Sequence, residues 1–376
     1  MTPPWDVIIV GSRVAGSTTA LLLARAGLRV LVVDRARRGA DTVSTHALMR
    51  GGVSQLHRWG LLDAVIAAGT PPVRRIVFHY GEDTVPVTVR PDAGVDALYA
   101  PRRILLDTVL ADAAAHAGAR IAYSSTVTGL LRDRNRVVGV NLRDRAGATR
   151  TERAGLVIGA DGRRSTVASG VGARTLLAGT RAGRIRYGYW RNLDTDGYEW
   201  FYRPGHTAGM IPTNDNLTCV FLGRPEPNPE LPPTTWASQP DSLATRLSHA
   251  QPVGSQRTVP GQPGFLKQAW GPGWALVGDA GHWKDPLSTH GMTAALRDAE
   301  LLANAVTTAP EPGPRQHDAL AHYQTVRDRL SLPMIQNVED LASYAWDLPR
   351  VQHLLRQIAQ AMSDEVHELT ILQTAA

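Results

Sequence analysis

Short apolar runs alternate with a helical pattern at the start of the chain. Residues 7–10 form a continuous apolar run, a glycine-bounded turn follows over 11–16, and apolar positions recur at helical spacing over 17–26. A second strand pattern covers residues 28–33, apolar throughout from residue 30, and ends at Asp34. Uninterrupted apolar runs of this length are typical of strands buried on both faces. The pattern therefore predicts a βαβ unit of about 30 residues, the size of half a dinucleotide-binding domain.

The rest of the chain is predicted to mix short strands with a few helices. Helices are expected over 53–68, 105–117 and 293–307. Strands are expected over 76–78, 85–89, 120–123, 137–142, 156–158, 184–192, 198–203 and 217–222. Five prolines within 225–233 indicate a loop, and 310–314 is a second break. Beyond it, apolar residues at helical spacing predict that the last sixty residues are helical.

Composition places the chain among ordinary globular proteins. It has 376 residues, of which 43% are hydrophobic and 20% charged, and this length favours two domains. No apolar run approaches the roughly 18 residues that a membrane span requires, and residues 5–10 resemble a strand rather than a secretory leader. The single cysteine, Cys219, excludes an internal disulfide and favours a reducing compartment. We therefore expect a cytoplasmic protein without a membrane span.

The net charge of +6 could suggest a nucleic-acid partner, but its distribution does not. All but two of the 40 basic residues are arginines, and the exceptions are Lys267 and Lys284. The arginines are scattered, without the basic and aromatic stripe of a nucleic-acid interface. Short clusters at 35–38 and 102–103 lie beside expected phosphate-binding elements. We expect anion handling at a cofactor and no nucleic-acid partner.

The turn over Gly11 to Gly16 carries the first candidate chemistry. Gly11 allows a tight turn and Gly16 allows close packing of helix on strand, so that the helix N-terminus meets a pyrophosphate with free N–H groups. Asp34, at the end of the second strand, is placed to accept hydrogen bonds from an adenosine ribose. Arg13 occupies a position where glycine is usual, which changes the approach of the backbone there.

Two further motifs follow predicted strands. Gly-Ala-Asp-Gly-Arg-Arg-Ser occupies 159–165, directly after the strand over 156–158. The sequence Trp-Ala-Leu-Val-Gly-Asp-Ala-Gly-His occupies 274–282 and leads through Asp285-Pro286 to His290-Gly291-Met292 at the start of a helix. A carboxylate at the end of such a strand can hold a ribityl hydroxyl, and the loop delivers a second helix N-terminus.

Together these motifs resemble the FAD-dependent aromatic hydroxylase superfamily. The ordered set is G-x-x-x-x-G…D-R, P-R-R-x-x-L-D, G-A-D-G-x-x-S and G-D-A-x-H-x-x-x-P-x-x-x-x-G, spread over residues 6 to about 305. The superfamily is typified by p-hydroxybenzoate hydroxylase, a group A flavoprotein monooxygenase, and has geranylgeranyl reductases and flavin-dependent halogenases among its relatives. The resemblance implies an α/β fold with a Rossmann-like FAD-binding domain, an inserted antiparallel β-sheet substrate domain and a C-terminal helical segment.

The resemblance also implies how the chain divides. The FAD-binding domain is expected to be discontinuous, over 1–72, 96–172 and 269–310. The β-rich substrate domain is expected over 73–95 and 173–268, and the C-terminal helices over 311–376. Within the substrate domain, Trp190, Trp200 and Tyr202 are candidates to line a pocket or simply to pack.

By the same resemblance, specific residues of this chain contact noncovalent FAD. Asp34 and Arg35 match contacts to the adenosine, Val127 a backbone contact to adenine, and Asp279 a ribityl contact. The implied contacts are Gly11, Arg13, Ala15, Gly16, Asp34, Arg35, Ser44, Arg103, Val127, Asp161, Asp279, Gly291, Met292 and Thr293. The last three lie at a helix N-terminus pointed at the flavin O2, where it stabilises the anion of reduced flavin. No metal is expected.

His46, Pro286 and His290 are the candidates for catalysis. The segment 41–46 matches the loop that passes over the flavin, and Pro286 opens the loop beneath it. His46 is either an acid or base near the flavin, for which an ordinary histidine pKa is suitable, or a residue that only hydrogen-bonds the pyrophosphate or backbone. The same two readings apply to His290.

The activity implied is a monooxygenase acting on an aromatic or polyketide-like small molecule. Relatives of this kind use NAD(P)H as a transient reductant and O2 to form a flavin C4a-hydroperoxide. Halogenation is disfavoured because the halogenase relatives need an active-site lysine from the N-terminal half, and no lysine precedes Lys267 in this chain. A reductase of an isoprenoid or other alkene is the alternative, since 198–204 partly matches the Y-x-W-x-F-P of prenyl reductases. A flavin-binding protein without turnover is a third possibility, because Ala168 replaces an arginine usual in the nicotinamide region. The sequence leaves the oligomeric state open.

Overall fold

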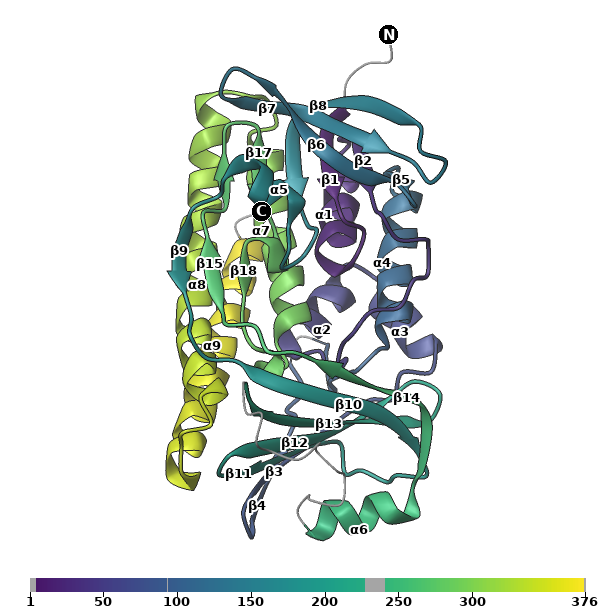
Figure 1. Ribbon diagram of the computed structural model, residues 1–376, viewed down its shortest axis with the longest axis vertical. Helices are drawn as coiled ribbons and strands as arrows, with labels where there is room; N and C mark the ends of the chain where they lie inside the picture. Colours follow the sequence, from purple (N-terminus) through teal and green to yellow (C-terminus); the bar gives the residue numbers. More distant parts are fainter. Residues whose placement is uncertain (1–4, 93, 227–240, 375–376) are drawn as a thin grey trace.

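A computed structural model describes residues 5–92, 94–226 and 241–374. Two large sheets lie one above the other in Figure 1, and long C-terminal helices run along one side of both. The upper sheet has eight strands and the lower one seven. Within the described ranges, no helix is long and apolar enough to cross a membrane.

The eight-stranded sheet is built on a parallel core. Its parallel strands, in spatial order, are β17 (Trp274–Leu276), β8 (Thr149–Gly159), β1 (Trp5–Val10), β2 (Val30–Val33) and β5 (Arg120–Ala122). Antiparallel additions are β16 (Trp270–Gly271) beside β17, and the hairpin of β6 (Thr126–Asp133) and β7 (Arg136–Arg143), which joins β8. The parallel order with helices between strands is that of a doubly wound fold.

Alternating side chains of β1 enter two different cores. Val7 and Ile9 pack in the main core, which includes residues of α1 (Val14–Arg25), α4 (Arg103–His116) and α7 (Gly291–Thr308). Ile8 and Val10 pack in a smaller core with the β6–β7 hairpin and α5 (Thr166–Val171). Both faces of the parallel strands are therefore covered, which explains their uninterrupted apolar sequences.

The seven-stranded sheet is antiparallel except for one pair. Its spatial order is β14 (Gln251–Val259), β10 (Gly183–Arg191), β13 (Leu217–Pro225), β12 (His206–Thr213), β11 (Tyr198–Arg203), β3 (Arg75–Tyr80) and β4 (Asp83–Thr88), with β11 and β3 parallel. Its inner face joins the main core through residues such as Tyr187, Trp200 and Phe221. Its outer face packs with α6 (Asp241–His249). Trp190 lies in that outer cluster, so it does not line an inner pocket.

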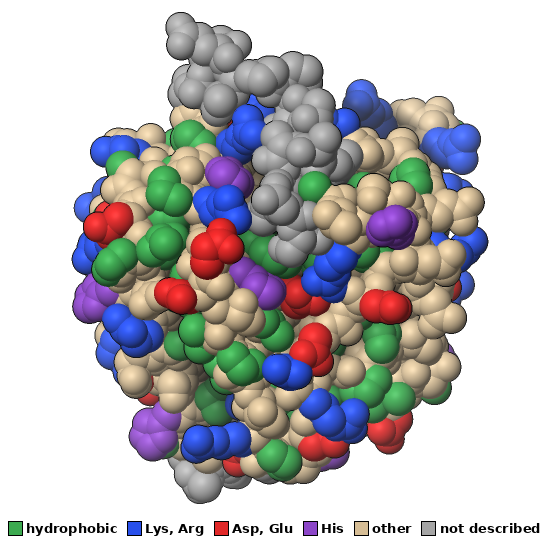
Figure 2. Space-filling model, turned by 90° about the horizontal axis from the view of Figure 1, so that it is seen from below, with side chains coloured by type: hydrophobic (Ala, Val, Ile, Leu, Met, Phe, Trp, Pro, Cys, Tyr) green, Lys and Arg blue, Asp and Glu red, His purple; other side chains and the backbone are tan. Residues whose placement is uncertain are grey.

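Smaller elements connect the two sheets. A three-stranded sheet is formed by β9 (Thr175–Ala178), β15 (Phe265–Lys267) and β18 (His282–Trp283). The C-terminal helices are α8 (Pro314–Ala342), which packs on α7, and α9 (Leu348–Thr374), which packs on α8 and α2 (Arg50–Arg58). Seen from below, Lys and Arg side chains lie interspersed with Asp and Glu rather than gathered in one patch (Figure 2).

The predicted fold class is confirmed, with differences in single elements. The single helix expected over 53–68 is wrong: the chain forms α2 and α3 (Leu62–Ala67), separated at Gly60, whose φ of 72° belongs to the left-handed region that ends helices. Strands β12 and β14 and helix α6 were not expected. Most of the loop predicted over 225–233 lies outside the described residues. The division into domains stays a prediction.

Candidate cofactor site at the carboxyl edge of the parallel sheet

Four predicted cofactor residues follow the carboxyl ends of neighbouring parallel strands. Gly11 follows β1, Asp34 follows β2, and Asp161 lies two residues beyond β8. Asp279 belongs to the single turn η2 (Gly278–Ala280) that follows β17. The strand ends are in register, since Val10 pairs with Val33 and with Gly159. In open α/β sheets this edge is where ligands bind.

The turn after β1 is packed so closely that two of its glycines are required. Gly11 has a φ of 104°, and a Cβ there would stand 2.5 Å from the carbonyl oxygen of Ala160. A Cβ on Gly16 would stand 1.9 Å from the carbonyl oxygen of Gly11. A Cβ on Gly278 would stand 2.9 Å from the Cβ of Ala15. The η2 turn and the start of α1 are thereby held together, with the first-turn N–H groups of α1 at the sheet edge.

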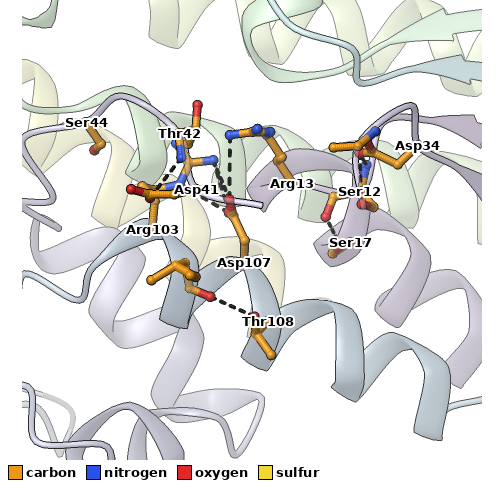
Figure 3. A network of polar contacts seen from close by, with 12 residues as sticks. Ser12, Arg13, Ser17, Asp34, Asp41, Thr42, Ser44, Arg103, Asp107 and Thr108 are labelled. Atoms are coloured by element: carbon orange, nitrogen blue, oxygen red, sulfur yellow. Dashed lines mark hydrogen bonds and ion pairs between the residues drawn. The ribbon is translucent and has the colours of Figure 1, made fainter. Parts of the chain in front are cut away.

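Asp34 is already engaged by its own neighbours. Its Oδ2 accepts hydrogen bonds from the Ser12 N–H at 2.6 Å and the Ser12 hydroxyl at 2.8 Å (Figure 3). Its Oδ1 accepts one from the Ala36 N–H at 2.7 Å. A carboxylate oxygen has about two acceptor positions, so Oδ1 keeps one for a ligand hydroxyl. The adjacent Arg35 is exposed, and its positive charge contributes to lowering the pKa of Arg13.

Arg13 and Arg103 both point at the carboxylate of Asp107 (Figure 3). Arg103 Nη2 donates to both oxygens of Asp107, at 3.0 and 3.1 Å. Arg13 Nη1 lies 4.0 Å from Asp107 Oδ2, is itself buried, and has no hydrogen-bond partner among the described residues. Burial lowers the pKa of the Arg13 guanidinium. An unpaired buried N–H on a cation is costly, and a phosphate oxygen would satisfy it.

The two remaining carboxylates at this edge are also incompletely satisfied. Asp161 Oδ2 accepts hydrogen bonds from the N–H groups of Thr166 at 2.6 Å and Val167 at 3.3 Å, whereas its buried Oδ1 has no partner within the described ranges. Asp279 has no hydrogen bond to any described residue. Burial raises the pKa of Asp279, and the positive charge of Lys284 offsets only part of that increase. Both are free to accept hydrogen bonds from ligand hydroxyls.

His46 is enclosed between this edge and the seven-stranded sheet. Its side chain is buried, its φ is 70°, and its Nδ1 accepts a hydrogen bond from the Arg103 N–H at 3.3 Å. Nε2 therefore carries the proton and donates it to the Tyr189 hydroxyl at 2.5 Å. Burial, followed by the charges of Arg103, Arg102 and Arg257, lowers the pKa of His46 to about 3. The imidazole is neutral at physiological pH, and its surroundings favour a hydrogen-bonding role over proton exchange.

The loop after β18 ties the two sheets together. Asp285 Oδ1 accepts from the Leu287 N–H at 3.0 Å, and its Oδ2 accepts from the N–H of Gly183, the first residue of β10, at 2.7 Å. Burial raises the pKa of Asp285 to about 6. Pro286 is thus fixed at the start of a single turn, η3 (Pro286–Ser288). Catalytic roles for Pro286 and His290 stay predictions.

Helix α7 begins at the end of that loop. Gly291, Met292 and Thr293 form its first turn, whose N–H groups have no partner within the helix. The Thr293 hydroxyl accepts a hydrogen bond from the Met49 N–H at 3.0 Å, which anchors the turn to the start of α2. The preceding His290 is buried, and its Nε2 lies 3.3 Å from Glu365 Oε1 on α9.

The features of this edge fit FAD. Free N–H groups, glycines without room for a Cβ and an Arg13 Nη1 that has no hydrogen-bond partner among the described residues suit a pyrophosphate. Carboxylate oxygens with acceptor positions left over suit the hydroxyls of ribose and ribityl. The family model described as an FAD binding domain matches residues 4–338. The chain belongs to this FAD-binding family. It is an FAD-dependent oxidoreductase.

Curated relatives of the family carry different named activities. Digeranylgeranylglycerophospholipid reductase 1 of Methanococcoides burtonii is 28% identical over 81% of this chain and 75% of its own length. Kynurenine 3-monooxygenase of Salinispora tropica is 29% identical over 89% of this chain and 80% of its own length. A solved structure of a probable FAD-dependent monooxygenase from Pseudomonas aeruginosa covers 94% of this chain and 100% of its own, with a TM-score of 0.78 and 21% identity, and supports the fold.

The remaining predicted contacts lie at different distances from this edge. Ser44 is close to it: its hydroxyl accepts from the His46 N–H at 3.0 Å. Val127 is buried in the smaller core, two residues after Ser125, whose N–H donates to the Asp34 carbonyl at 2.9 Å. Sequence reasoning did not connect Tyr189 to His46 and did not predict that Lys284 is buried.

Proposed function

We propose that this protein is an FAD-dependent monooxygenase that hydroxylates an aromatic or polyketide-like small molecule with NAD(P)H and O2. The hydrogen bond from His46 to Tyr189 carries this proposal. It joins the segment expected over the flavin to the inner face of the seven-stranded sheet. A substrate bound against that face would therefore lie close to the cofactor edge.

The inner face carries aromatic side chains, which pack in the main core in this structure. Tyr187 and Tyr189 lie edge to face with ring centroids 6.1 Å apart, and Trp200 lies 5.8 Å from Phe221. Arg102 lies over the Tyr189 ring at 5.0 Å from its centroid. Rings arranged in this way favour stacked or edge contacts with another planar ring. The relation to a kynurenine 3-monooxygenase agrees with an aromatic substrate class.

Different residues of the carboxyl edge would bind different parts of the cofactor. Arg13 and the start of α1 would bind the pyrophosphate, Asp34 the ribose, and Asp279 the ribityl chain. FAD supplies the redox chemistry with O2, for which NAD(P)H provides the electrons. The first turn of α7 would face the flavin O2 with free N–H groups. His46, neutral and hydrogen-bonded on both nitrogens, would hold Tyr189 in place.

Reduction of an isoprenoid or other alkene is the second candidate. It is favoured by the relation to digeranylgeranylglycerophospholipid reductases at similar identity, 28% against 29% for the monooxygenase. The two activities differ in whether an oxygen atom from O2 enters the product. A hydroxylase incorporates an atom of O2 into its product, whereas an alkene reductase adds hydrogen without O2.

The test measures oxygen incorporation directly. FAD-loaded protein would be mixed with NADH or NADPH, ¹⁸O-labelled O2 and a panel of p-hydroxybenzoate, anthranilate, kynurenine and a polycyclic phenol. The proposal predicts that at least one aromatic probe stimulates O2 uptake and gains one labelled oxygen atom. If no probe is labelled and a geranylgeranyl lipid is instead hydrogenated without O2, the reductase candidate replaces it.

A further inference from the structure

Glu365, on the C-terminal helix α9, contacts two residues at the start of α7. It is 2% exposed and lies beyond residue 338, where the match to the FAD-binding family ends. Its Oε2 accepts a hydrogen bond from Arg297 Nη1 at 2.7 Å, and its Oε1 lies 3.3 Å from His290 Nε2. Arg297 is within the first two turns of α7, and the buried His290 directly precedes the helix. One carboxylate thus links α9 to both residues.

Arg297 determines which way the Glu365 carboxylate faces. The guanidinium is buried, and its Nη2 donates to Asp298 Oδ1 and to Ser331 Oγ on α8, each at 2.7 Å. Its Nη1 donates to Glu365 Oε2. Hydrogen bonds between charged groups are about twice as strong as neutral ones, so Oε2 stays with Arg297. The other oxygen, Oε1, is thereby left facing His290.

The contact with Glu365 fixes the position of the proton on His290. Burial lowers the pKa of His290, so its imidazole is neutral at neutral pH and carries one proton. Burial would raise the pKa of Glu365, but its contacts with His290 and Arg297 hold it well below the usual range, so the carboxylate is ionised. An ionised carboxylate can only accept hydrogen bonds, which places the proton on Nε2. Nδ1 is then an acceptor, buried and without a hydrogen-bond partner among the described residues.

A glycine on α2 leaves room for this contact. A Cβ on Gly51 would stand 3.3 Å from Glu365 Oε1 and 3.3 Å from Thr293 Cγ2. Thr293 belongs to the first turn of α7, and its hydroxyl accepts from the Met49 N–H at 3.0 Å. The starts of α2 and α7 therefore meet α9 at one point, and the carboxylate reaches His290 across the space that Gly51 leaves.

We propose that Glu365 is a positioning residue of the cofactor site, which fixes the first turn of α7 through His290. This inference rests on the proposed placement of FAD, in which the N–H groups of that turn face the flavin O2. The carbonyl oxygen of His290 accepts the first hydrogen bond of α7, from the Ala294 N–H at 2.9 Å, so a shift of His290 also shifts the start of the helix. Donors that are held in place before a ligand arrives need no reorganisation when it binds.

The substitution Glu365→Gln separates this role from simple packing, because it keeps the size of the side chain but leaves one oxygen for two donors. The amide oxygen should stay with Arg297, so that the amide N–H group donates to His290 Nε2. The proton of His290 should then move from Nε2 to Nδ1. Long-range ¹H–¹⁵N spectra of the histidine-labelled apoprotein at neutral pH, assigned with His290→Gln, report this change of tautomer.

Glu368→Gln is the matched control for this measurement. Glu368 lies on the same helix, and its Oε2 is paired with the exposed Arg329 at 2.5 Å. The change removes the same charge from α9 without touching His290. It should leave the tautomer of His290 as in the wild type.

The second measurement concerns bound FAD. Glu365→Gln should weaken FAD binding by about threefold to tenfold, the loss expected for one weakened hydrogen bond, and should shift the absorbance bands of the bound flavin. The double variant Glu365→Gln with His290→Gln should bind FAD no more weakly than His290→Gln alone, because Glu365 acts through His290. Additive losses would contradict this. Gly51→Ala, which crowds Glu365 Oε1 and Thr293 from the other side, should weaken FAD binding in the same direction and serves if Glu365→Gln fails to fold.

The outcomes separate this inference from the proposed function. If the ring nitrogens of His290 have the same ¹⁵N shifts in Glu365→Gln as in the wild type, Glu365 does not hold His290 and the inference is wrong. A changed tautomer with wild-type FAD affinity and absorbance also overturns it, because His290 then does not fix the turn. In either case, labelling of an aromatic probe by ¹⁸O2 leaves the proposed function standing. A wild-type protein that binds no FAD overturns both.

Discussion

His46 Nε2 lies 2.5 Å from the hydroxyl of Tyr189, a residue 143 positions away in the sequence. This hydrogen bond connects the segment beside the carboxyl edge of the parallel sheet to the seven-stranded sheet. Because His46 also accepts from the Arg103 N–H, both of its nitrogens are occupied. A buried residue at a φ of 70° is costly to maintain, and such positions concentrate at functional sites.

We expect Tyr189→Phe and His46→Gln to impair turnover by a similar amount and to leave FAD bound. Each removes one partner of a buried hydrogen bond, a loss of about 1–3 kcal/mol, which corresponds to about 5- to 150-fold in kcat/KM. Neither variant should remove a rate-controlling pKa near 6.5, because His46 is already neutral there. A pH profile in which His46→Gln abolishes such a pKa would restore the acid or base role.

Asp279→Ala should weaken FAD binding by about tenfold or more, since a buried hydrogen-bonded contact contributes about 1–3 kcal/mol. Fluorescence titration of the apoprotein with FAD measures this. Asp298, further along α7, is unsuitable as a control because it is fully buried and bonded to Arg297. The exposed Asp318 on α8 is suitable, and Asp318→Asn should bind FAD normally. Equal affinity of Asp279→Ala and Asp318→Asn would contradict the ribityl assignment.

Arg13→Ala should also weaken FAD binding, and high salt should reduce the difference from wild type. We assign the pyrophosphate to Arg13 Nη1, which has no hydrogen-bond partner among the described residues, and charged hydrogen bonds contribute about 1.5–3 kcal/mol. The exposed Arg315 on α8 provides a charge-matched control, Arg315→Ala. A loss of affinity as large in Arg315→Ala would indicate a general charge effect instead.

The stability of the protein should fall as pH decreases through the histidine range. His46 binds fewer protons in the folded than in the unfolded state between pH of about 3 and 6.5, so its contribution to the free energy of unfolding rises with pH over that interval. Urea denaturation at pH 7 and pH 5 should show a smaller loss for His46→Gln than for wild type. An identical loss in both would contradict the lowered pKa of His46.

Local sequence patterns were sufficient to predict which residues follow the parallel strands, but not to predict strand β14 or the break in the helix at Gly60. Gly11, Asp34 and Asp279 follow short apolar strands, and parallel strands bring their carboxyl ends to one edge whatever else the chain does. Strand β14 escaped prediction because it is a mostly exposed edge strand without apolar alternation. Gly60 divided a helix whose apolar pattern continues across the break.

The contacts of His46 and His290 with distant parts of the chain depend on tertiary packing. Tyr189 lies on a strand of the second sheet and Glu365 on the last helix, so no local pattern connects them to His46 or His290. Lys284 gave no periodic signal, and its burial became visible only in the folded chain. Residues of this kind could be recognised only after the helices and sheets were placed together.

The identity of the released flavin tests the account most directly. Purified protein, incubated with FAD and FMN together and freed of excess, would be heat-denatured and its supernatant analysed by chromatography and mass spectrometry. The account predicts FAD in the supernatant at about one molecule per chain, because Arg13, Asp34 and the turn at Gly11 are arranged for the ADP half of the cofactor. FMN alone, flavin retained on the precipitated chain, or no flavin at all would contradict it.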